Sequence, residues 1–285
     1  MAEPREPTWR AKWLGQKLRA LRKNKNFTIA DVADRLGCST ATVNRFELGT
    51  YPLKGEEMLM LLNMFSLPDG GERDELFKLA KEVAERGWVE SLVSKRSFAD
   101  FVWAESKCRR IRSFQLAVFP GSLQAPEYAE ALIESGPNEA SAKVALVEAR
   151  LARGRALAKP NAPEARFLLH ESMLHQRIEG FSTRVYRKQF ERLLEATEQA
   201  NVELRVAPLG FGAHTALGVT TGFTILDMPD SWPMLAHVET PLGGMVAETP
   251  DVDSLTDAYE SLWEANTLDE KRTRDQLARM LKELD

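Results

Sequence analysis

Apolar residues recur at helical spacing through the first third of the chain. This pattern predicts five short helices, at residues 9–21, 28–36, 40–48, 55–65 and 73–86. The second of these helices has a single buried stripe, formed by Ile29, Val32, Ala33 and Leu36. Short and mostly polar segments connect the helices. We therefore expect a compact five-helix domain over residues 1–87.

Capping residues mark the second and third predicted helices. Thr28 begins the second helix, and Asp31 follows three positions later as a short-armed version of a capping box. Gly37 ends that helix, because glycine adopts the left-handed conformation of a helix C-terminus readily. Ser39 can cap the third helix. Two helices joined by so tight a turn are typical of a helix-turn-helix, whose second helix lies in the major groove of DNA.

The pattern changes after residue 88, where helices and alternating apolar runs interleave. Helices are predicted at 98–112, 126–135, 138–158, 182–200, 253–266 and 268–284. Strands are predicted at 166–170, 202–206, 219–227, 234–239 and 243–248. Residues 113–119 fit either a strand or a continuation of the preceding helix. The fold class we expect is α+β with two domains, the helical one over 1–87 and a mixed α/β domain over 88–285.

Composition sets the broad class of the protein. The 285 residues are 44% hydrophobic and 28% charged, which indicates a soluble globular chain of about two domains. No apolar run has the roughly 18 residues that a membrane span needs, and the N-terminus lacks the apolar core of a signal peptide. Cys38 and Cys108 lack neighbours at metal-site spacing, which fits a reducing compartment. We expect a cytoplasmic, nucleoid-associated protein with no membrane contact.

The distribution of charge changes the meaning of the net charge. The formal value is −4, which argues against a nucleic-acid partner when it is taken alone. Residues 1–54, however, contain eleven Lys and Arg against five Asp and Glu, whereas the remaining residues contain 27 against 37. A basic end on an acidic body indicates that a polyanion binds the basic end.

The third predicted helix has four residues on its exposed side that can reach base edges in the major groove: Thr40, Ala41, Asn44 and Arg45. Arg45 can form a fork with guanine and Asn44 with adenine, while the small side chains suit a thymine methyl group. Other residues carry hydroxyl, ammonium or guanidinium groups that can contact phosphates on either side of this helix. They are Lys17, Arg19, Lys25, Thr28, Ser39, Thr50 and Lys54. One module contacts little DNA, so we expect a homodimer on a palindromic operator.

The segment LRALRKNKNFTIADVADRLGCSTATVNRFELG resembles the XRE, or lambda-repressor-like, helix-turn-helix domain, and the match covers nearly all of residues 10–66. This resemblance implies double-stranded DNA as the partner. It also implies a structural ion pair between Arg22 of the first helix and Glu47 at the end of the recognition helix. Ile29 departs from the family, which often has a DNA-contacting glutamine there, so whether Ile29 removes a DNA contact stays open.

Motifs of the second domain resemble the C-terminal domain of actinobacterial antitoxin-like regulators of the WhiJ type. They are PGSLQAPEYAEALI at 120–133, RLARGRAL at 150–157, FLLHESMLHQRIEG at 167–180, NVELRVAPLGFGAH at 201–214 and GFTIL at 222–226. The first differs from the usual PGLLQT at Ser122 and Ala125. The resemblance implies a transcriptional regulator with a small partner protein, often encoded nearby.

No enzyme signature emerges from the second domain. His170 and His175 are one residue too far apart for HExxH, so their rings do not share one helix face for zinc. His214 lacks the lysine that a phospholipase-D-like HxK motif has two positions later, since that position is Ala216. No serine or cysteine triad is recognisable from spacing. We expect no enzymatic activity, no cofactor and no metal.

Two features of the second domain leave alternatives open. Five residues fit either a ligand or partner surface or ordinary packing and capping: Gln124, Tyr128, Glu171, His214 and Trp232. The charge run of Glu148, Arg150, Arg153 and Arg155 fits either a solvated helix face or a subunit or anion contact. The alternative function is accordingly a metabolite-gated repressor whose second domain binds a small molecule.

Overall fold

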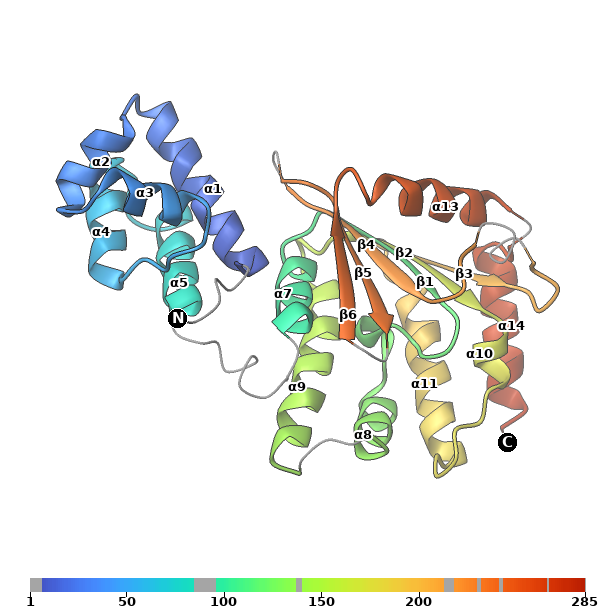
Figure 1. Cartoon of the computed structure of the whole chain (residues 1–285). Coiled ribbons are helices and arrows are strands. Elements are labelled where there is room, and N and C mark those ends of the chain that lie inside the picture. The colour runs from blue at the N-terminus through green and yellow to red at the C-terminus, as the bar shows by residue number, and fades with distance from the viewer. Residues whose placement is uncertain are drawn as a thin grey trace. The chain divides into compact units, whose positions relative to one another are not determined.

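We describe a computed structural model of the chain (Figure 1). It describes residues 7–84, 96–136, 140–212, 218–229, 232–240, 243–265 and 267–284. The chain divides into two compact units, Met1–Asp100 and Phe101–Asp285, here called unit 1 and unit 2. The boundary expected at residues 87 and 88 lies outside the described residues.

Unit 1 contains the five expected helices. They are α1 (Trp9–Asn24), α2 (Ile29–Leu36), α3 (Thr40–Glu47), α4 (Gly55–Met64) and α5 (Glu72–Ala84). Their apolar faces meet in one core, which includes Leu14, Leu18, Val32, Val43, Phe46, Met58, Leu62, Phe65 and Leu76. In α2 the predicted stripe is partly correct, because Val32 and Ala33 are buried whereas Ile29 and Leu36 stay half-buried.

Unit 2 is built on a six-stranded sheet in the order β3-β2-β1-β4-β5-β6. The strands are β1 (Arg110–Gln115), β2 (Glu164–His170), β3 (Val202–Ala207), β4 (Phe223–Asp227), β5 (Leu235–Thr240) and β6 (Gly243–Glu248). Strands β1, β2 and β3 are parallel to one another, and β4 to β6 join them as antiparallel neighbours. This topology confirms the expected mixed α/β class.

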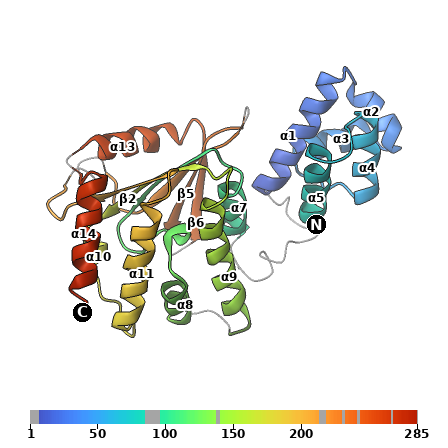
Figure 2. The ribbon, with the colours of Figure 1, turned by 180° about the vertical axis from the view of Figure 1, so that it is seen from behind.

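Helices cover both faces of the sheet (Figures 1 and 2). Helix α13 (Asp253–Glu264) lies on one face, while α8 (Pro126–Glu134), α9 (Ala140–Leu157) and α11 (Thr183–Ala196) lie on the other. Helix α14 (Glu270–Lys282) packs against α11 and β3. The remaining elements are α7 (Arg96–Glu105), the short η1 (Gly121–Leu123) and α10 (Ser172–His175). No described helix is long and apolar enough to cross a membrane.

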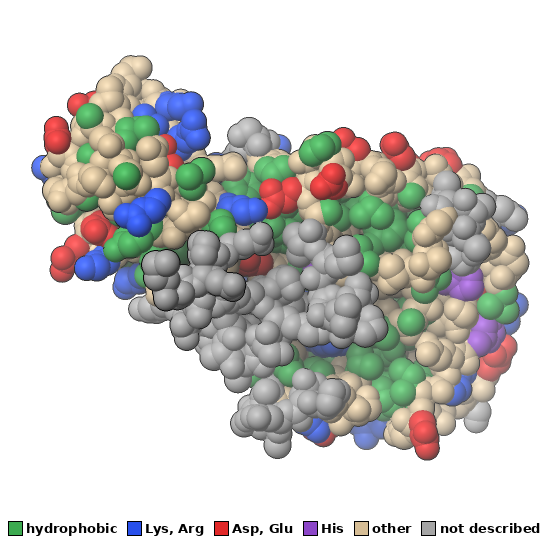
Figure 3. Space-filling model, viewed as in Figure 1, with side chains coloured by type: hydrophobic (Ala, Val, Ile, Leu, Met, Phe, Trp, Pro, Cys, Tyr) green, Lys and Arg blue, Asp and Glu red, His purple; other side chains and the backbone are tan. Residues whose placement is uncertain are grey.

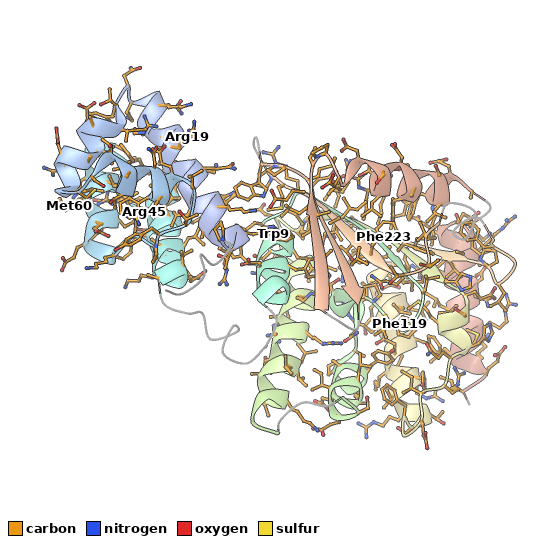
Figure 4. The ribbon with its side chains drawn as sticks, viewed as in Figure 1. Trp9, Arg19, Arg45, Met60, Phe119 and Phe223 are labelled. Atoms are coloured by element: carbon orange, nitrogen blue, oxygen red, sulfur yellow. The ribbon has the colours of Figure 1, made fainter. Side chains whose placement is uncertain are left out.

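Each face of the sheet has its own aromatic core. On the α13 side, Phe223 packs with Phe114, Tyr259 and Trp263. On the other side, Phe119 packs with Tyr128 and Phe190 from α8 and α11. Figure 4 labels Phe119 and Phe223, which mark these two cores.

The C-terminal end of one predicted helix is wrong. The pattern of Phe101, Ala104, Cys108 and Ile111 predicts a helix over 98–112, but α7 ends at Glu105 and β1 begins at Arg110. The strand has buried side chains on both faces, so it lacks the alternation by which sequence reveals a strand. Arg112 is among its buried residues because Asp227 and Glu260 pair with its guanidinium from β4 and α13.

Candidate nucleic-acid interface

Helices α2 and α3 form the expected helix-turn-helix, and local side-chain bonds set both of its helix starts. The Thr28 hydroxyl accepts from the Asp31 amide at 3.1 Å, and the Thr28 amide donates to the Asp31 carboxylate at 2.7 Å. Gly37 ends α2 with a φ of 65°, the left-handed region in which glycine is favoured. The Ser39 hydroxyl accepts from the Thr42 amide at 3.2 Å and begins α3.

The four predicted base-contacting residues lie on the exposed side of α3. Val43 and Phe46 point into the core with exposed fractions of 1% and 4%. The residues exposed by this placement are Thr40, Ala41, Asn44 and Arg45. The helix therefore presents one polar face of small, amide and guanidinium side chains.

The buried ion pair between Arg22 and Glu47 joins the recognition helix to α1. The Arg22 guanidinium donates to both oxygens of the Glu47 carboxylate, and its third contact is the Phe27 carbonyl at 3.0 Å. This bidentate bond holds the pKa of Arg22 above its ordinary value. Arg19 also approaches Glu47, at 4.0 Å, but its side chain is 52% exposed. The ion pair implied by the family resemblance is thus present.

Two glycines bring the backbones of α1 and α3 into contact, a feature that sequence reasoning missed. A Cβ on Gly15 would lie 2.5 Å from the Phe46 carbonyl oxygen. A Cβ on Gly49, directly after α3, would lie 2.5 Å from the Ala11 carbonyl carbon. Gly49 also has a φ of 72°. Both positions therefore require glycine if the helices are to keep this separation.

The candidates for phosphate contact surround α3, and several of their polar groups already have partners. The Thr28 hydroxyl donates to the Asp31 carboxylate at 2.8 Å, so a phosphate would have to displace Asp31. The Thr50 hydroxyl donates to the Arg45 carbonyl at 3.2 Å, and the Lys17 ammonium lies over the Trp13 ring. Arg19 and Lys54 are exposed. Figure 3 shows several basic side chains in blue on the surface of unit 1. Figure 4 labels Arg19 on α1 and Arg45 on α3.

Asp31 makes the start of α2 sensitive to acid. The Thr28 amide and hydroxyl both donate to its carboxylate, and these bonds hold the pKa of Asp31 below its ordinary value. The stabilisation is fully present above the pKa of the unfolded chain, about 3.9, and is lost as pH falls through the lower folded value. We expect Asp31→Asn to be less stable than the wild type at about pH 6, with the difference shrinking as pH falls below about 4.

Urea unfolding followed by circular dichroism across this pH range measures that difference. Asp34→Asn is the matched control, because it removes the same charge from an exposed position of α2 outside the capping box. A difference that stays constant across the whole range would show that the Asp31 charge does not contribute.

The motif segments of unit 2 pack together around η1. The Arg153 guanidinium of α9 lies against Gly121, so a larger residue at position 121 would have to displace the end of that side chain. Arg153 donates to both carboxylate oxygens of Glu105, and the pair is 10% and 7% exposed. Gln189 of α11, which is fully buried, accepts from the Ala125 amide and donates to the Leu123 carbonyl.

Comparison with known protein families assigns both units. Residues 13–76 match the family model of a helix-turn-helix domain. Residues 98–279, more than half of the chain, match the family model of a domain of unknown function, DUF5753. The chain belongs to the DUF5753 family. Neither the curated proteins nor the solved structures contain a match.

Two of the candidate ligand residues of the DUF5753 domain lie in its core. The Gln124 amide donates to the Phe119 carbonyl at 2.7 Å and its oxygen accepts from Arg150 at 2.9 Å. Tyr128 is 2% exposed and packs edge-on against Phe119, and burial raises its pKa to about 12. These hydrogen bonds and ring contacts are what we expect if Gln124 and Tyr128 serve ordinary packing and capping.

The other three candidates are Glu171, Trp232 and His214. Glu171 joins the end of β2 to the loop after β3 and to α14, because its carboxylate accepts from the Leu209 amide and from Gln276. Trp232 is buried just before β5. His214 lies outside the described residues. Within the described ranges, no three His, Cys, Asp or Glu side chains group as metal ligands would.

The charge run of the DUF5753 domain separates into an exposed and an inward pair. Glu148 and Arg155 form an exposed ion pair at 3.3 Å, as a solvated face requires. Arg150 and Arg153 turn inward to Gln124 and Glu105. Only Glu148 and Arg155 therefore form a solvent-exposed helix face. Arg150 and Arg153 instead connect α9 to the end of η1 and to α7.

Proposed function

We propose that this chain is a sequence-specific transcriptional regulator that binds a palindromic operator as a homodimer. The helix-turn-helix domain supports DNA binding and regulation at the general level. The observation that carries the finer proposal is the exposed face of α3, where Thr40, Ala41, Asn44 and Arg45 stand clear of the buried Val43 and Phe46. A helix with this arrangement can enter the major groove and contact base edges.

The four exposed residues have different roles in this proposal. Arg45 donates to O6 and N7 of a guanine, and Asn44 pairs with N6 and N7 of an adenine. Thr40 and Ala41, at the N-terminal end of α3, allow close approach and contact a thymine methyl group. Lys17, Arg19, Ser39 and Lys54 contact phosphates and fix the register of α3 on the duplex.

The charge distribution supports the same orientation on DNA. Eleven of the 38 Lys and Arg residues lie within the first 54 positions, where only five Asp and Glu accompany them. The rest of the chain carries an excess of acidic residues. Repulsion between this acidic part and the phosphates lowers non-specific affinity and steers the basic surface toward the duplex.

A homodimer follows from the size of a single reading module. One such module buries too little surface on DNA for the affinity that a regulator needs. Two copies related by a twofold axis would place their α3 helices in successive major grooves, about 34 Å apart.

We further propose that unit 2 receives the regulatory signal from a small protein partner, as in antitoxin-like regulators of the WhiJ type from actinobacteria. The support is the resemblance of the motifs at 120–133, 150–157 and 167–180 to those regulators. The hydrogen bonds of Gln124, which connect it to its own unit, favour this partner over the metabolite-gated alternative at that position.

The decisive experiment is selection of duplexes from a random-sequence pool by the purified full chain. We expect an enriched palindromic sequence, a protein mass in solution equal to twice that of the chain, and affinity that falls steeply with salt. Purification from the native host should also recover a small protein. If the full chain enriches no sequence and shows no salt-dependent affinity for any duplex, the proposed function is wrong.

Two substitutions separate base contact from phosphate contact. Arg45→Ala should weaken binding to the enriched duplex by about 1–3 kcal/mol and relax one base position in each half-site. Lys54→Ala should weaken enriched and unrelated duplexes alike and reduce the salt dependence. Fluorescence anisotropy on both duplexes at several salt concentrations measures these effects. Equal losses for Arg45→Ala on the two duplexes would show that Arg45 contacts only phosphate.

A further inference from the structure

Tyr51 lies four positions after the last residue of α3, the candidate recognition helix, and its ring contacts Arg45, the candidate guanine-reading residue. The Arg45 guanidinium stands over the Tyr51 ring, 5.2 Å from its centroid. Tyr51 is 41% exposed. Its other neighbour is the buried Phe46, whose ring centroid lies 5.5 Å away. Tyr51 thus bridges the core of unit 1 and the reading face of α3.

The turn that carries Tyr51 is fixed by backbone contacts. The Thr50 amide donates to the Arg45 carbonyl at 3.0 Å and the Thr50 hydroxyl donates to it at 3.2 Å. Gly49, in its left-handed conformation, sits directly against the backbone of α1. These contacts fix the backbone that leads into Tyr51, and the packing of its ring against the buried Phe46 supports the ring independently of the Arg45 side chain.

A chain of hydrogen bonds through two hydroxyl groups of the same helix face also restrains the Arg45 side chain. The Arg45 Nη2 donates to the Thr42 hydroxyl at 3.3 Å, and the Thr42 hydroxyl in turn lies 3.0 Å from that of Ser39. Ser39, Thr42 and Arg45 are three positions apart, so they share one side of α3. Among the described residues, the Nε and Nη1 groups of Arg45 have no hydrogen-bond acceptor.

We propose that Tyr51 is a positioning residue that orients Arg45 for a guanine, an inference that rests on the proposed DNA-binding function. A ring on the face of a guanidinium leaves its edge donors available for the fork that O6 and N7 of guanine require. Holding the side chain before binding also reduces the rotamer entropy that would be lost on binding. A phosphate contact tolerates a loose side chain, so such preorientation matters for base recognition.

The test compares three variants of the full chain on the duplex that the wild type enriches from a random-sequence pool. The variants are Tyr51→Leu, Tyr51→Phe and Arg45→Ala. We expect Tyr51→Leu to bind about two- to fivefold more weakly, and to relax the same base position that Arg45→Ala relaxes. Tyr51→Phe retains the ring and should bind like the wild type. Adding Tyr51→Leu to Arg45→Ala should cause no further loss, because the two residues act through one contact.

The other outcomes overturn the inference in distinguishable ways. A uniform loss on enriched and unrelated duplexes, or a loss that adds fully to that of Arg45→Ala, would show that Tyr51 acts separately from Arg45. A loss in Tyr51→Phe equal to that in Tyr51→Leu would show that the hydroxyl itself contacts DNA. Thermal unfolding of each variant identifies a loss that comes only from destabilised unit 1, which also contradicts the positioning role. Failure of the wild type to enrich any sequence would instead overturn the proposed function, and this inference with it.

Discussion

Replacing Arg22 with alanine is expected to lower the free energy of unfolding of unit 1 by about 3–5 kcal/mol. The substitution leaves the Glu47 carboxylate, 7% exposed, without its bidentate partner inside the unit. It also removes the donor to the Phe27 carbonyl. Domains of this size have a total stability of only about 5–15 kcal/mol, so the variant should be close to unfolding.

Arg19→Ala is the matched control for this prediction. Arg19 stands on the same helix and approaches the same carboxylate, but its side chain is 52% exposed and the separation is 4.0 Å. We expect a loss of less than about 1 kcal/mol. Urea unfolding with pulse hydrogen exchange and mass spectrometry measures unit 1 separately from unit 2. Equal losses for Arg19→Ala and Arg22→Ala would contradict the prediction.

A double variant distinguishes the cost of an orphaned charge from the value of the pair. Arg22→Met combined with Glu47→Leu removes both charges and keeps apolar volume at the contact between α1 and α3. Replacing a whole buried pair in this way is often close to neutral. We therefore expect the double variant to be more stable than Arg22→Ala alone, by the same measurement.

Arg153→Ala is expected to have a comparable effect on unit 2, about 3–5 kcal/mol. Glu105 would lose both of its guanidinium hydrogen bonds at a site where only 7% of its side chain is exposed. The Phe101 ring would also lose the guanidinium that lies 5.2 Å from its centroid. The substitution therefore removes contacts from α9 to two residues of α7.

Arg155→Ala is the control, two positions along the same helix. Its partner Glu148 is 58% exposed and Arg155 itself 63%, so solvent screens the pair and the expected loss is below about 1 kcal/mol. The same pulse-exchange experiment, monitored on peptides of unit 2, compares the two variants. A small loss for Arg153→Ala would mean that Glu105 finds water or another donor when Arg153 is removed.

Features of the fold that depend on neighbouring residues were predictable from the sequence. Thr28 with Asp31, Gly37 and Ser39 define the ends of α2 and α3 through bonds that span three or four positions. The exposed face of α3 was predictable for the same reason, because the helical spacing of Val43 and Phe46 within eight residues shows which side of the helix is buried. The family resemblance supplied Arg22 and Glu47, which are 25 positions apart.

Features that depend on distant residues were not predictable. Arg112 is polar by sequence, but its partners Asp227 and Glu260 lie 115 and 148 positions away and make its burial in β1 possible. Arg153 belongs to a charge run that resembles a solvated face until Glu105, 48 positions earlier, is brought against it. The sequence does not show why a glycine occupies position 15 within a helix. The reason is the backbone of α3, which leaves no room for a Cβ there.

The close approach of α1 and α3 at Gly15 and Gly49 has a consequence for how this regulator can change over evolution. Main-chain atoms, which substitution does not alter, set the spacing between the two helices. The exposed residues of α3 can therefore be exchanged without shifting the helix relative to α1. Under the proposed function, single surface replacements would then change the operator preference, while the packing of α3 on α1 would stay the same.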